Sequence, residues 1–336
     1  MKTVTLEQPG RFTLTDTAQP AAPGSGEVLV RVLTVGICGT DLHAFEGTQP
    51  FFTYPRILGH ELAVEVIESN GSEFKSGDKC AVNPYMTCGA CSACLRGRTN
   101  CCAKMRVIGV HSDGGMRDRI VLPAKQLYKC ETLAPVQIPL VETLGVGIHA
   151  TGRAEVQAGD RAIVVGAGPI GLSVIEFLKL AGADIGVVEK IPERLEFAAR
   201  HHGLKRGYPS HEEAKQEEAS MLVFDCTGDR GSMEGSIQLL QQGGKLIFVG
   251  LINDSISLFD PDLHRREATI LASRNSTPAE HHRVLDLMES VEIDVSAWPT
   301  DFVRPEAMEK RFPLWLHREA GVVKAVIDWE GGGDSR

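Results

Sequence analysis

The feature of this sequence that most constrains its fold is a glycine-rich turn between a strand pattern and a helix pattern. Residues 160–165 have the apolar, β-branched content of a buried strand, and Gly166-x-Gly168-x-x-Gly171 follows them directly. Glycine at these places permits a tight turn, close approach of a pyrophosphate and close packing of helix on strand. The N-terminus of the helix pattern at residues 169–180 then faces the anion. The segment predicts a dinucleotide site that includes Gly166, Gly168, Pro169, Ile170 and Gly171.

An acidic residue at the end of the second strand pattern narrows the choice of dinucleotide. Glu189 lies 18 residues beyond Gly171, where a carboxylate accepts hydrogen bonds from the adenosine ribose hydroxyls and repels a 2′-phosphate. A glycine turn alone also serves to cap a helix, but strand, helix and acidic residue occur here in register. Lys190 and Arg194 are nearby cations that suit a 2′-phosphate. We therefore expect NAD, with Glu189 and Arg194 at the cofactor, and NADP as the alternative.

The rest of the central region repeats the alternation of strand and helix that builds a parallel sheet. Strand patterns fall at residues 160–165, 184–189, 221–225, 245–251 and 270–273, and helix patterns at residues 169–180, 192–201 and 233–240. The charged residues 210–219 predict a surface helix. Together these patterns predict an α/β domain with a doubly wound parallel sheet of the Rossmann type.

The regions before and after this domain have a different composition. Short strand-like runs, such as residues 28–35, recur up to about residue 140 and predict a mostly β domain with long loops. After about residue 274, a helical pattern and then the strand-like run VVKAVIDW indicate a return to the first domain. The GGG at residues 331–333 predicts a disordered end.

Length and charge exclude several classes of protein. A chain of 336 residues is long enough for two domains with large cores. Its 44 Asp and Glu against 35 Lys and Arg give a net charge of −9, which argues against a nucleic-acid partner. No run of 18 apolar residues occurs, and the first ten residues lack the apolar core of a signal peptide. We expect a cytoplasmic protein without a membrane partner.

Four thiols within 15 residues, in a segment at about residues 85–105, have the spacing of a loop that wraps one structural zinc ion. They are Cys88, Cys91, Cys94 and Cys102, with Cys101 as an alternative fourth ligand. An iron–sulfur cluster is a competing use of four thiolates. The segment is locally basic, as in nucleic-acid zinc modules, but a single zinc loop in an acidic chain gives that interpretation little support.

Several motifs, in their order along the chain, resemble those of the zinc-dependent medium-chain dehydrogenase family. They are GICGTDLH at 36–43, GHE at 59–61, the four cysteines, DGG at 113–115, VETLGVGIHA at 141–150 and VGAGPIG at 165–171. The resemblance covers nearly the whole chain. It implies a GroES-like, mostly β catalytic domain at residues 1–145, a Rossmann domain at residues 146–273, and a return of residues 274–336 to the first domain.

The resemblance also assigns metal ligands that spacing alone does not connect. It places a catalytic zinc on Cys38, His60 and Glu142, each of which by itself is typical of an ordinary core or turn residue. Its cysteine pattern selects Cys102 over Cys101. Glutamate as the third ligand is similar to the polyol and threonine dehydrogenase branch. Two zinc ions per chain, one catalytic and one structural, are therefore expected.

The implied reaction is hydride transfer from an alcohol to the nicotinamide of the cofactor. Zinc with three protein ligands keeps one open position for the substrate oxygen, where it stabilises the alkoxide. Thr40, two residues after Cys38, offers a hydroxyl that bridges the substrate oxygen and the cofactor ribose, and His43 passes the proton to solvent. Glu61 is expected to support the ligands or to bind the metal transiently.

Three further residues are expected at the substrate. Arg274 and Asn275 follow a strand pattern without an evident packing role, and a guanidinium suits a carboxylate or several hydroxyls. His111 lies in a loop that resembles a substrate-side segment of the polyol branch. The stretches QPFFTYPR, VIGVHSDGG and SRNSTP resemble bacterial sugar-acid oxidoreductases of the L-galactonate 5-dehydrogenase group.

The expected function is NAD-linked oxidation of a secondary alcohol of a sugar acid or polyol to a ketone. The alternatives are an L-threonine or short diol dehydrogenase on the same scaffold, and a non-catalytic dinucleotide-binding protein. A homodimer or homotetramer is typical of the family. The pairs His201–His202 and His281–His282 are expected on solvated helix faces.

Overall fold

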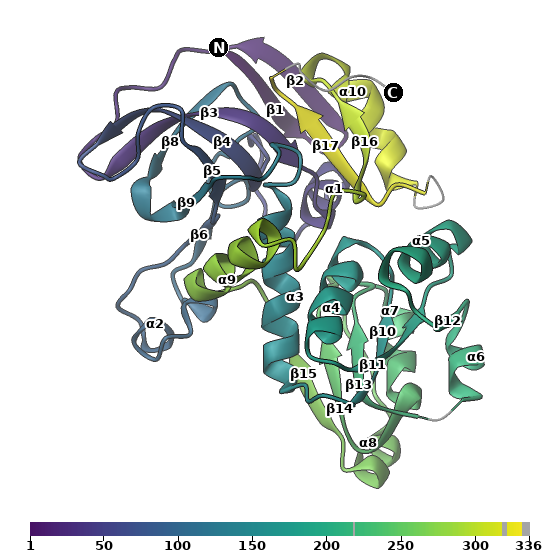
Figure 1. Ribbon diagram of the computed structural model, residues 1–336. Helices are drawn as coiled ribbons and strands as arrows, with labels where there is room; N and C mark the ends of the chain where they lie inside the picture. Colours follow the sequence, from purple (N-terminus) through teal and green to yellow (C-terminus); the bar gives the residue numbers. More distant parts are fainter. Residues whose placement is uncertain (218, 318–320, 331–336) are drawn as a thin grey trace. The chain divides into compact units, whose positions relative to one another are not determined.

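The computed structural model describes residues 1–217, 219–317 and 321–330, and the chain divides into two compact units (Figure 1). Unit 1 comprises Met1–Glu142 and Thr277–Arg336, and unit 2 comprises Thr143–Ser276. The GGG at residues 331–333 lies outside the described residues. Among the helices that the structure describes, none combines the length and the apolar character that crossing a membrane requires.

Unit 1 is built on a seven-stranded, mostly antiparallel sheet. Its strands are β3 (Glu27–Gly36), β4 (Glu61–Asn70), β5 (Lys79–Val82), β8 (Arg119–Pro123), β9 (Leu127–Cys130), β16 (Pro299–Val303) and β17 (Lys324–Asp328). Two small sheets pair β1 (Lys2–Gln8) with β2 (Arg11–Asp16), and β6 (Tyr85–Met86) with β7 (Arg106–Val107). The helices are α1 (Gly39–Glu46), α2 (Ser92–Leu95), α9 (Pro278–Glu289) and α10 (Met308–Arg311).

The C-terminal segment completes this sheet. The strand order is β16-β17-β3-β4-β5-β9, with β8 paired to β3 as well, so β17 lies beside a strand from the start of the chain (Figure 1). Its register places Val326 opposite Gly36 on one side of β3, while Glu61 stands opposite the same glycine on the other side. The end of β3 and the start of β4 therefore meet the middle of β17 at Gly36.

Aromatic packing also joins the C-terminal segment to the first part of the chain. Phe12 from β2, Phe45 from α1 and Phe312 near the C-terminus are buried together, with ring centroids 4.9 to 5.3 Å apart. Such ring contacts add to the free energy gained by removing apolar area from water. The C-terminal segment is thus part of the core of unit 1.

Unit 2 has a six-stranded parallel sheet in the order β12-β11-β10-β13-β14-β15. Its strands are β10 (Arg161–Val165), β11 (Asp184–Val188), β12 (Arg206–Tyr208), β13 (Ser220–Asp225), β14 (Leu240–Phe248) and β15 (Thr269–Ala272). The helices are α4 (Pro169–Leu180), α5 (Pro192–His202), α6 (His211–Lys215), α7 (Arg230–Gly235) and α8 (Asp260–Arg266), and α3 (Leu140–Ala154) begins just before the unit. The chain order reverses beside β10, the doubly wound arrangement whose switch point binds ligands.

The predicted fold class is confirmed, and several bounds are corrected. The helix expected at residues 233–240 begins earlier, as α7, and ends in a 3-10 turn at Ser236–Leu239. β14 starts five residues before the predicted strand, because residues 240–244 extend it beyond the purely apolar run. The charged segment 210–219 forms only the short α6, capped by Ser210. The short β12 was not predicted at all.

The expectation that both histidine pairs are solvated is wrong for one member of each. His202 and His281 are buried, whereas His201 is partly exposed and His282 is exposed. Successive residues on a helix point about 100° apart, so one histidine of each pair faces the interior.

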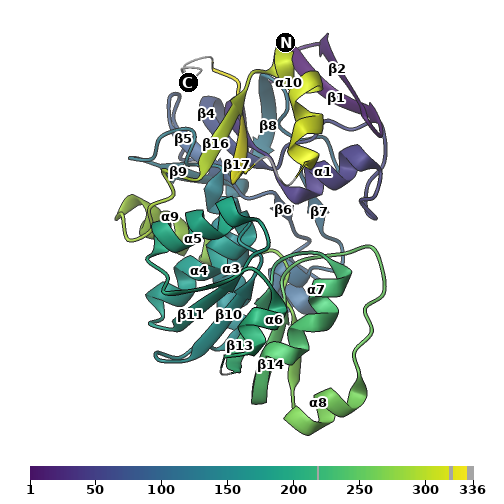
Figure 2. The ribbon, with the colours of Figure 1, turned by 90° about the vertical axis from the view of Figure 1, so that its right-hand side faces the viewer.

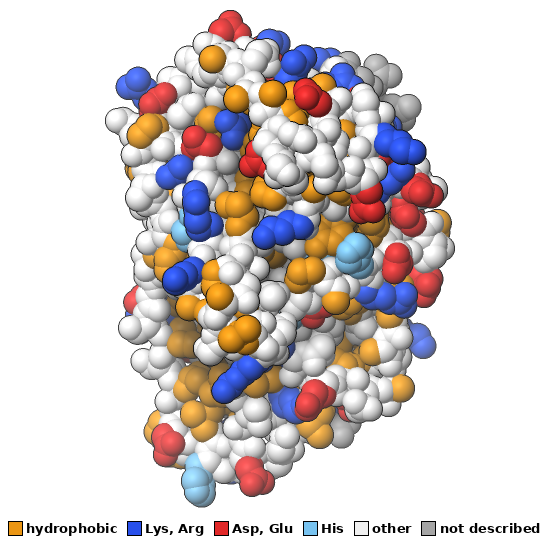
Figure 3. Space-filling model, turned by 90° about the vertical axis from the view of Figure 1, so that its left-hand side faces the viewer, with side chains coloured by type: hydrophobic (Ala, Val, Ile, Leu, Met, Phe, Trp, Pro, Cys, Tyr) orange, Lys and Arg blue, Asp and Glu red, His pale blue; other side chains and the backbone are white. Residues whose placement is uncertain are grey.

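Charged side chains are mixed with apolar ones on the face drawn in Figure 3. Lys and Arg side chains are scattered there, with Asp, Glu and hydrophobic side chains between them. This face therefore carries no continuous basic surface.

Candidate active site

Unit 1 brings together three metal-binding types of side chain from separate segments. One ligand atom each of Cys38, His60 and Glu61 lies within 4.8 Å of the others. Cys38 immediately precedes α1, His60 immediately precedes β4, and Glu61 is the first residue of β4. Thiolate, imidazole and carboxylate are the donors that Zn²⁺ binds in proteins. These three residues, called the Cys38 cluster below, therefore suit a zinc ion.

Asp41 connects two members of the Cys38 cluster. Its Oδ2 accepts a hydrogen bond from the backbone N–H of Cys38 at 3.0 Å, which fastens the first turn of α1. Its Oδ1 lies 3.6 Å from Nδ1 of His60. A carboxylate beside an imidazole fixes the orientation of the ring for its other nitrogen. Gly59, with a φ of 95°, supplies the turn that directs His60 inward.

Glu61, the third member of the Cys38 cluster, forms a buried ion pair. Nζ of Lys324 in β17 contacts Oε2 of Glu61, and both side chains are at most 2% exposed. Gly36 makes this possible, because a Cβ there would collide with the Glu61 carboxylate and touch the Lys324 side chain. The cation offsets the cost of burying the Glu61 charge.

Glu142 lies in the same unit and has a different partner. It occupies the first turn of α3 and is buried. The hydroxyl of Tyr85 donates a hydrogen bond to Oε1 of Glu142. The backbone N–H of Tyr85 in turn donates to Oδ1 of Asn83 at 2.9 Å. The 4.8 Å group contains Glu61, whereas Glu142 stands outside it.

Electrostatic interactions couple these residues. Burial raises the pKa of Glu142, and the nearby charge of His60 opposes that change. Burial lowers the pKa of His60, but Asp41, Cys38 and Glu142 outweigh this effect and hold that pKa well above its usual value. A metal needs the unprotonated imidazole, so metal and proton compete at His60. We expect metal occupancy to fall as the pH falls.

Thr40 and His43 lie three residues apart on α1 and so share one side of the helix. Both are partly exposed. Nδ1 of His43 lies 3.3 Å from Oγ1 of Thr48 and 3.4 Å from Oε2 of Glu46. This places a titratable ring between the start of α1 and solvent.

The four cysteines that the sequence analysis assigns to the segment at about residues 85–105 are called the lobe cysteines below. They form one group, with a sulfur from each within 4.8 Å of the others. The sulfur atoms of Cys88 and Cys102, and those of Cys91 and Cys94, are each 3.5 Å apart. Backbone N–H groups of Cys94 and Ala103 lower the pKa of Cys91 to about 6. Burial raises the pKa of Cys94 to about 12, so the proximity of the four sulfur atoms, and not their titration, is what suits the structural zinc that their spacing predicts.

In unit 2, the glycine turn has the predicted conformation. Gly166 follows β10 with a φ of 93°, and a Cβ on Gly171 would collide with the carbonyl oxygen of Gly166. Gly168 is the N-cap of α4, and a Cβ there would meet no atom within 4 Å. Steric contacts inside the chain therefore explain Gly166 and Gly171, while Gly168 borders open space that a pyrophosphate can approach.

Glu189 accepts two hydrogen bonds from the backbone at and near this turn. Its Oε2 accepts a hydrogen bond from the backbone N–H of Ala167 at 2.8 Å, and its Oε1 accepts one from Ile191 at 2.9 Å. A carboxylate offers about four acceptor positions, so two remain for other donors such as ribose hydroxyls.

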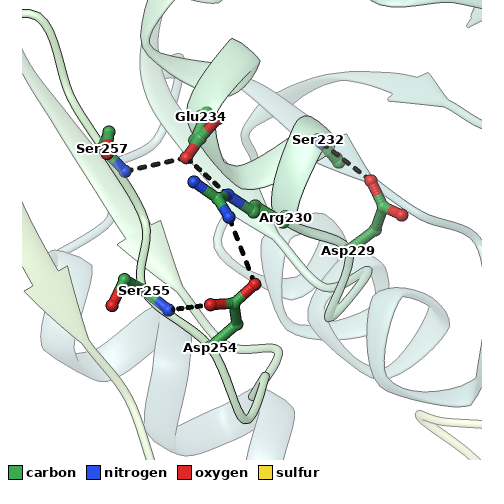
Figure 4. Close-up of polar contacts among 7 residues, drawn as sticks. All are labelled: Asp229, Arg230, Ser232, Glu234, Asp254, Ser255 and Ser257. Carbon is green, nitrogen blue, oxygen red and sulfur yellow. Dashed lines mark hydrogen bonds and ion pairs between the residues drawn. The ribbon is translucent and has the colours of Figure 1, made fainter.

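A polar network that the sequence analysis missed joins the segments after β13 and β14 (Figure 4). Arg230 on α7 binds Oε1 of Glu234 at 3.1 Å and Oδ2 of Asp254 at 3.3 Å. The backbone N–H of Ser257 donates to the same Glu234 oxygen at 2.8 Å. The network therefore ties α7 to the segment that follows β14.

The remaining predicted residues lie on loops or at element ends. Arg274 is exposed after β15, and Asn275 has a φ of 53°, a left-handed conformation that asparagine tolerates. His111 is exposed, and its Nδ1 accepts a hydrogen bond from the backbone N–H of Val107 at 3.1 Å. Arg194 is partly exposed in the first turn of α5.

Three residues at the Cys38 cluster were missed by the sequence analysis. They are Asp41, Tyr85 and Lys324. Asp41 stands three residues after a helix N-cap, a spacing that predicts a capping contact. Lys324 is the first residue of β17 and lies between apolar residues of the run VVKAVIDW, which is a sign of a buried pair. Nothing in the sequence near Tyr85 indicates its bond to Glu142.

Comparisons with known proteins agree with this architecture. Residues 24–132 match the alcohol dehydrogenase GroES-like domain, and residues 169–290 match the zinc-binding dehydrogenase domain. The chain is 39% identical to L-galactonate-5-dehydrogenase of Escherichia coli K12 over 79% of its own length and 81% of that protein.

Two solved structures are similar over nearly the whole chain. A short chain alcohol dehydrogenase of Escherichia coli CFT073, complexed with NADH, has a TM-score of 0.89 and 26% identity, covering 98% of this chain and 99% of that one. A protein of Sinorhizobium meliloti 1021 bound to NADP has a TM-score of 0.89 and 27% identity, with the same coverage. The chain therefore belongs to the zinc-binding, medium-chain alcohol dehydrogenase family of oxidoreductases.

Proposed function

We propose that the protein oxidises a secondary alcohol of a sugar acid or polyol to a ketone, with zinc and NAD. The observation that carries this proposal is the Cys38 cluster, which gathers a thiol, an imidazole and a carboxylate from segments far apart in sequence. The similarity to a sugar-acid dehydrogenase supports the substrate class. The alcohol loses a hydride to NAD⁺ and a proton to solvent, giving ketone, NADH and H⁺.

Cys38, His60 and Glu142 would hold the catalytic zinc, with Glu61 supporting them or taking a place among the ligands. The set of one thiolate, one neutral imidazole and one carboxylate has a formal charge of −2, which balances Zn²⁺. When bound, zinc supplies the Lewis acidity that makes an alcohol proton easier to remove. Tyr85 orients Glu142 and Asp41 orients His60, so each ligand has a partner that fixes its position.

Thr40 and His43 would carry the proton away. The Thr40 hydroxyl would accept the proton of the substrate hydroxyl while it gives up its own. His43 would receive that proton and release it to solvent, which its partly exposed position on α1 permits. Three-residue spacing on one helix supports this order of transfer.

The glycine turn of unit 2 would bind the dinucleotide through Gly166, Gly168, Pro169, Ile170 and Gly171. Glu189 favours NAD, since its carboxylate accepts from ribose hydroxyls and repels a 2′-phosphate. Arg194 would lie beside the adenosine ribose. Similar proteins bind NADH or NADP, so the choice between them belongs to the test below.

Arg274, with Asn275 and His111, would contact the substrate. A guanidinium binds a carboxylate through two parallel hydrogen bonds, which favours a sugar acid over a neutral polyol. The lobe cysteines Cys88, Cys91, Cys94 and Cys102 would hold a second, structural zinc ion.

We also propose a homodimer or homotetramer. β15 is an edge strand of the sheet in unit 2, and most of its residues are exposed, including Ile270 at 39%. Exposed apolar edge strands are commonly covered by pairing with another chain. Light scattering on the purified protein tests this directly.

The first experiment is an NADH-absorbance screen of the zinc-replete protein. The panel contains L-galactonate and other aldonates, neutral polyols, L-threonine and short diols, each with NAD and with NADP, and the zinc content is measured in parallel. We expect turnover of an aldonate with NAD and two zinc ions per chain. Turnover of threonine or neutral polyols instead would reject the sugar-acid assignment, and one zinc ion without any turnover would reject the catalytic site.

A further inference from the structure

A second cluster of metal-binding side chains lies in unit 2, on two neighbouring helices. One ligand atom each of Glu176, His201 and His202 lies within 4.8 Å of the others. Glu176 belongs to α4, and the histidines form the end of α5. None of the three has a part in the glycine turn or in the Cys38 cluster.

The geometry is compatible with coordination of a single ion. Nδ1 of His202 lies 3.3 Å from Oε1 of Glu176, which matches the separation of two ligand atoms on one tetrahedral ion with bonds of about 2 Å. The His201 and His202 rings are perpendicular, with centroids 4.8 Å apart. Two imidazoles can therefore point at one position from different directions.

Burial and access both suit an ion. The side chains of His202 and Glu176 are 0% and 7% exposed, so they form the floor of the site. His201 is partly exposed, so one of the three side chains reaches solvent, and its ring stacks on Phe197 with centroids 5.4 Å apart. The donors are held by packing before any ligand arrives.

The charges around the site favour a cation. Burial lowers the pKa of His202, so its ring is neutral at pH 7 and available as a ligand. Glu176 supplies the negative charge, while Lys179 on the same helix is the nearby opposing cation, and it is exposed and screened by water.

We propose that Glu176, His201 and His202 form a further metal site that takes a divalent transition ion and ties α4 to α5. Two nitrogens and one carboxylate oxygen select Ni²⁺, Cu²⁺, Co²⁺ or Zn²⁺ over Mg²⁺ and Ca²⁺. Because the ion binds the folded unit, it stabilises the native state.

The test is a titration with Ni²⁺ of untagged protein that has been dialysed until metal analysis gives two zinc ions per chain, followed by calorimetry and by thermal unfolding. We expect one Ni²⁺ per chain beyond the zinc ions, with a rise in Tm. His201→Ala removes the accessible ligand, and Glu176→Gln keeps the shape but removes the charge. Each should weaken Ni²⁺ binding by at least about tenfold and abolish the Tm rise.

His264→Ala is the matched control, because His264 is an exposed histidine near the end of another helix of the same unit, α8. It should bind Ni²⁺ like the unaltered protein. Thermal unfolding without Ni²⁺ checks that every variant is folded. The proposal is overturned if no additional Ni²⁺ binds, or if all three variants bind it as the unaltered protein does. Neither result depends on turnover, so the proposed function is tested separately.

Discussion

The two candidate zinc sites of unit 1 are assembled in opposite ways. The lobe cysteines all lie within 15 residues, on short turns whose backbone N–H groups point at the sulfurs. The Cys38 cluster joins the start of α1 to the start of β4, and its neighbours Lys324 and Glu142 come from the other end of the chain and from α3. One site is local and requires a loop, whereas the other is non-local and requires the whole sheet.

This difference predicts how each site responds to a substitution. Three of the four lobe cysteines are exposed or partly exposed, so a bound ion would order a segment that has little core of its own. The Cys38 cluster is surrounded by buried acids, a buried lysine and a buried tyrosine, each compensated by another. A single substitution there leaves a partner uncompensated, at a cost of several kcal/mol.

The largest expected effect is a loss of activity, which should occur at the Cys38 cluster and much less at the lobe cysteines. His60→Ala should lower kcat by at least about a thousandfold, because the Lewis acid contributes several kcal/mol to the reaction. It should also reduce the zinc content from two ions to one. Cys91→Ser should lose the other ion and lower the Tm while retaining much more activity. Steady-state kinetics and metal analysis measure both, and equal losses of activity in the two variants would remove the distinction.

The next effect is on stability. Lys324→Met leaves the Glu61 carboxylate buried without its cation, which should lower the free energy of unfolding by about 3–5 kcal/mol. Lys129→Met is the control, since the Lys129 side chain that pairs with Asp78 is half exposed, and water screens that ion pair so that its loss should have a much smaller effect. Urea denaturation compares them. Similar losses in both variants would show that burial of the pair is unimportant.

A pH effect comes third. His281 packs beside Tyr85 with ring centroids 6.0 Å apart, and burial lowers its pKa from 6.5 to about 4. The unfolded chain therefore binds more protons than the native one between these values, and stability falls as the pH drops through this range. The loss from pH 7 to pH 5 should be about 2 kcal/mol from this residue.

His281→Phe keeps an aromatic ring and should remove that part of the pH dependence. His282→Phe alters the exposed neighbour and should leave it intact. Urea denaturation at the two pH values gives the comparison. A pH dependence that is the same in all three proteins would assign the loss to other groups.

The smallest effect concerns the positioning of Glu142. Tyr85→Phe removes the hydrogen bond to its carboxylate, and outer partners of metal ligands typically account for about a tenfold change in metal affinity or activity. Tyr128→Phe, at a tyrosine that contacts His281 but not Glu142, is the matched control. Competition with a zinc chelator measures the affinity. Equal affinity in the two variants would mean that Tyr85 does not position Glu142.

Periodicity and local spacing indicated much of the fold. The βαβ units of unit 2 were predictable because a parallel strand is apolar throughout and each is followed by a helix pattern. The bounds of β14 and α7 were less accurate. Residues 241–244 are Gln and Gly, which do not indicate a strand, and the pairing of β14 with β13 includes Leu240 and resumes only at Lys245. The prediction for the two histidine pairs was wrong because composition does not show which side of a helix is buried. The packing of α5 and α9 decides that.

The sequence by itself determined what is local: the glycine turn and Glu189 in register with β10 and β11, the four-cysteine lobe, and the strand and helix alternation of unit 2. Only the tertiary structure decided which distant side chains meet. Cys38, His60, Glu61 and Lys324 come together because β3 pairs with β4 on one side and with β17 on the other. The same holds for Glu176 with the His201–His202 pair, which neighbouring helices bring together. Spacing along the chain carries no information about such contacts, because they depend on which strands pair and which helix faces are buried.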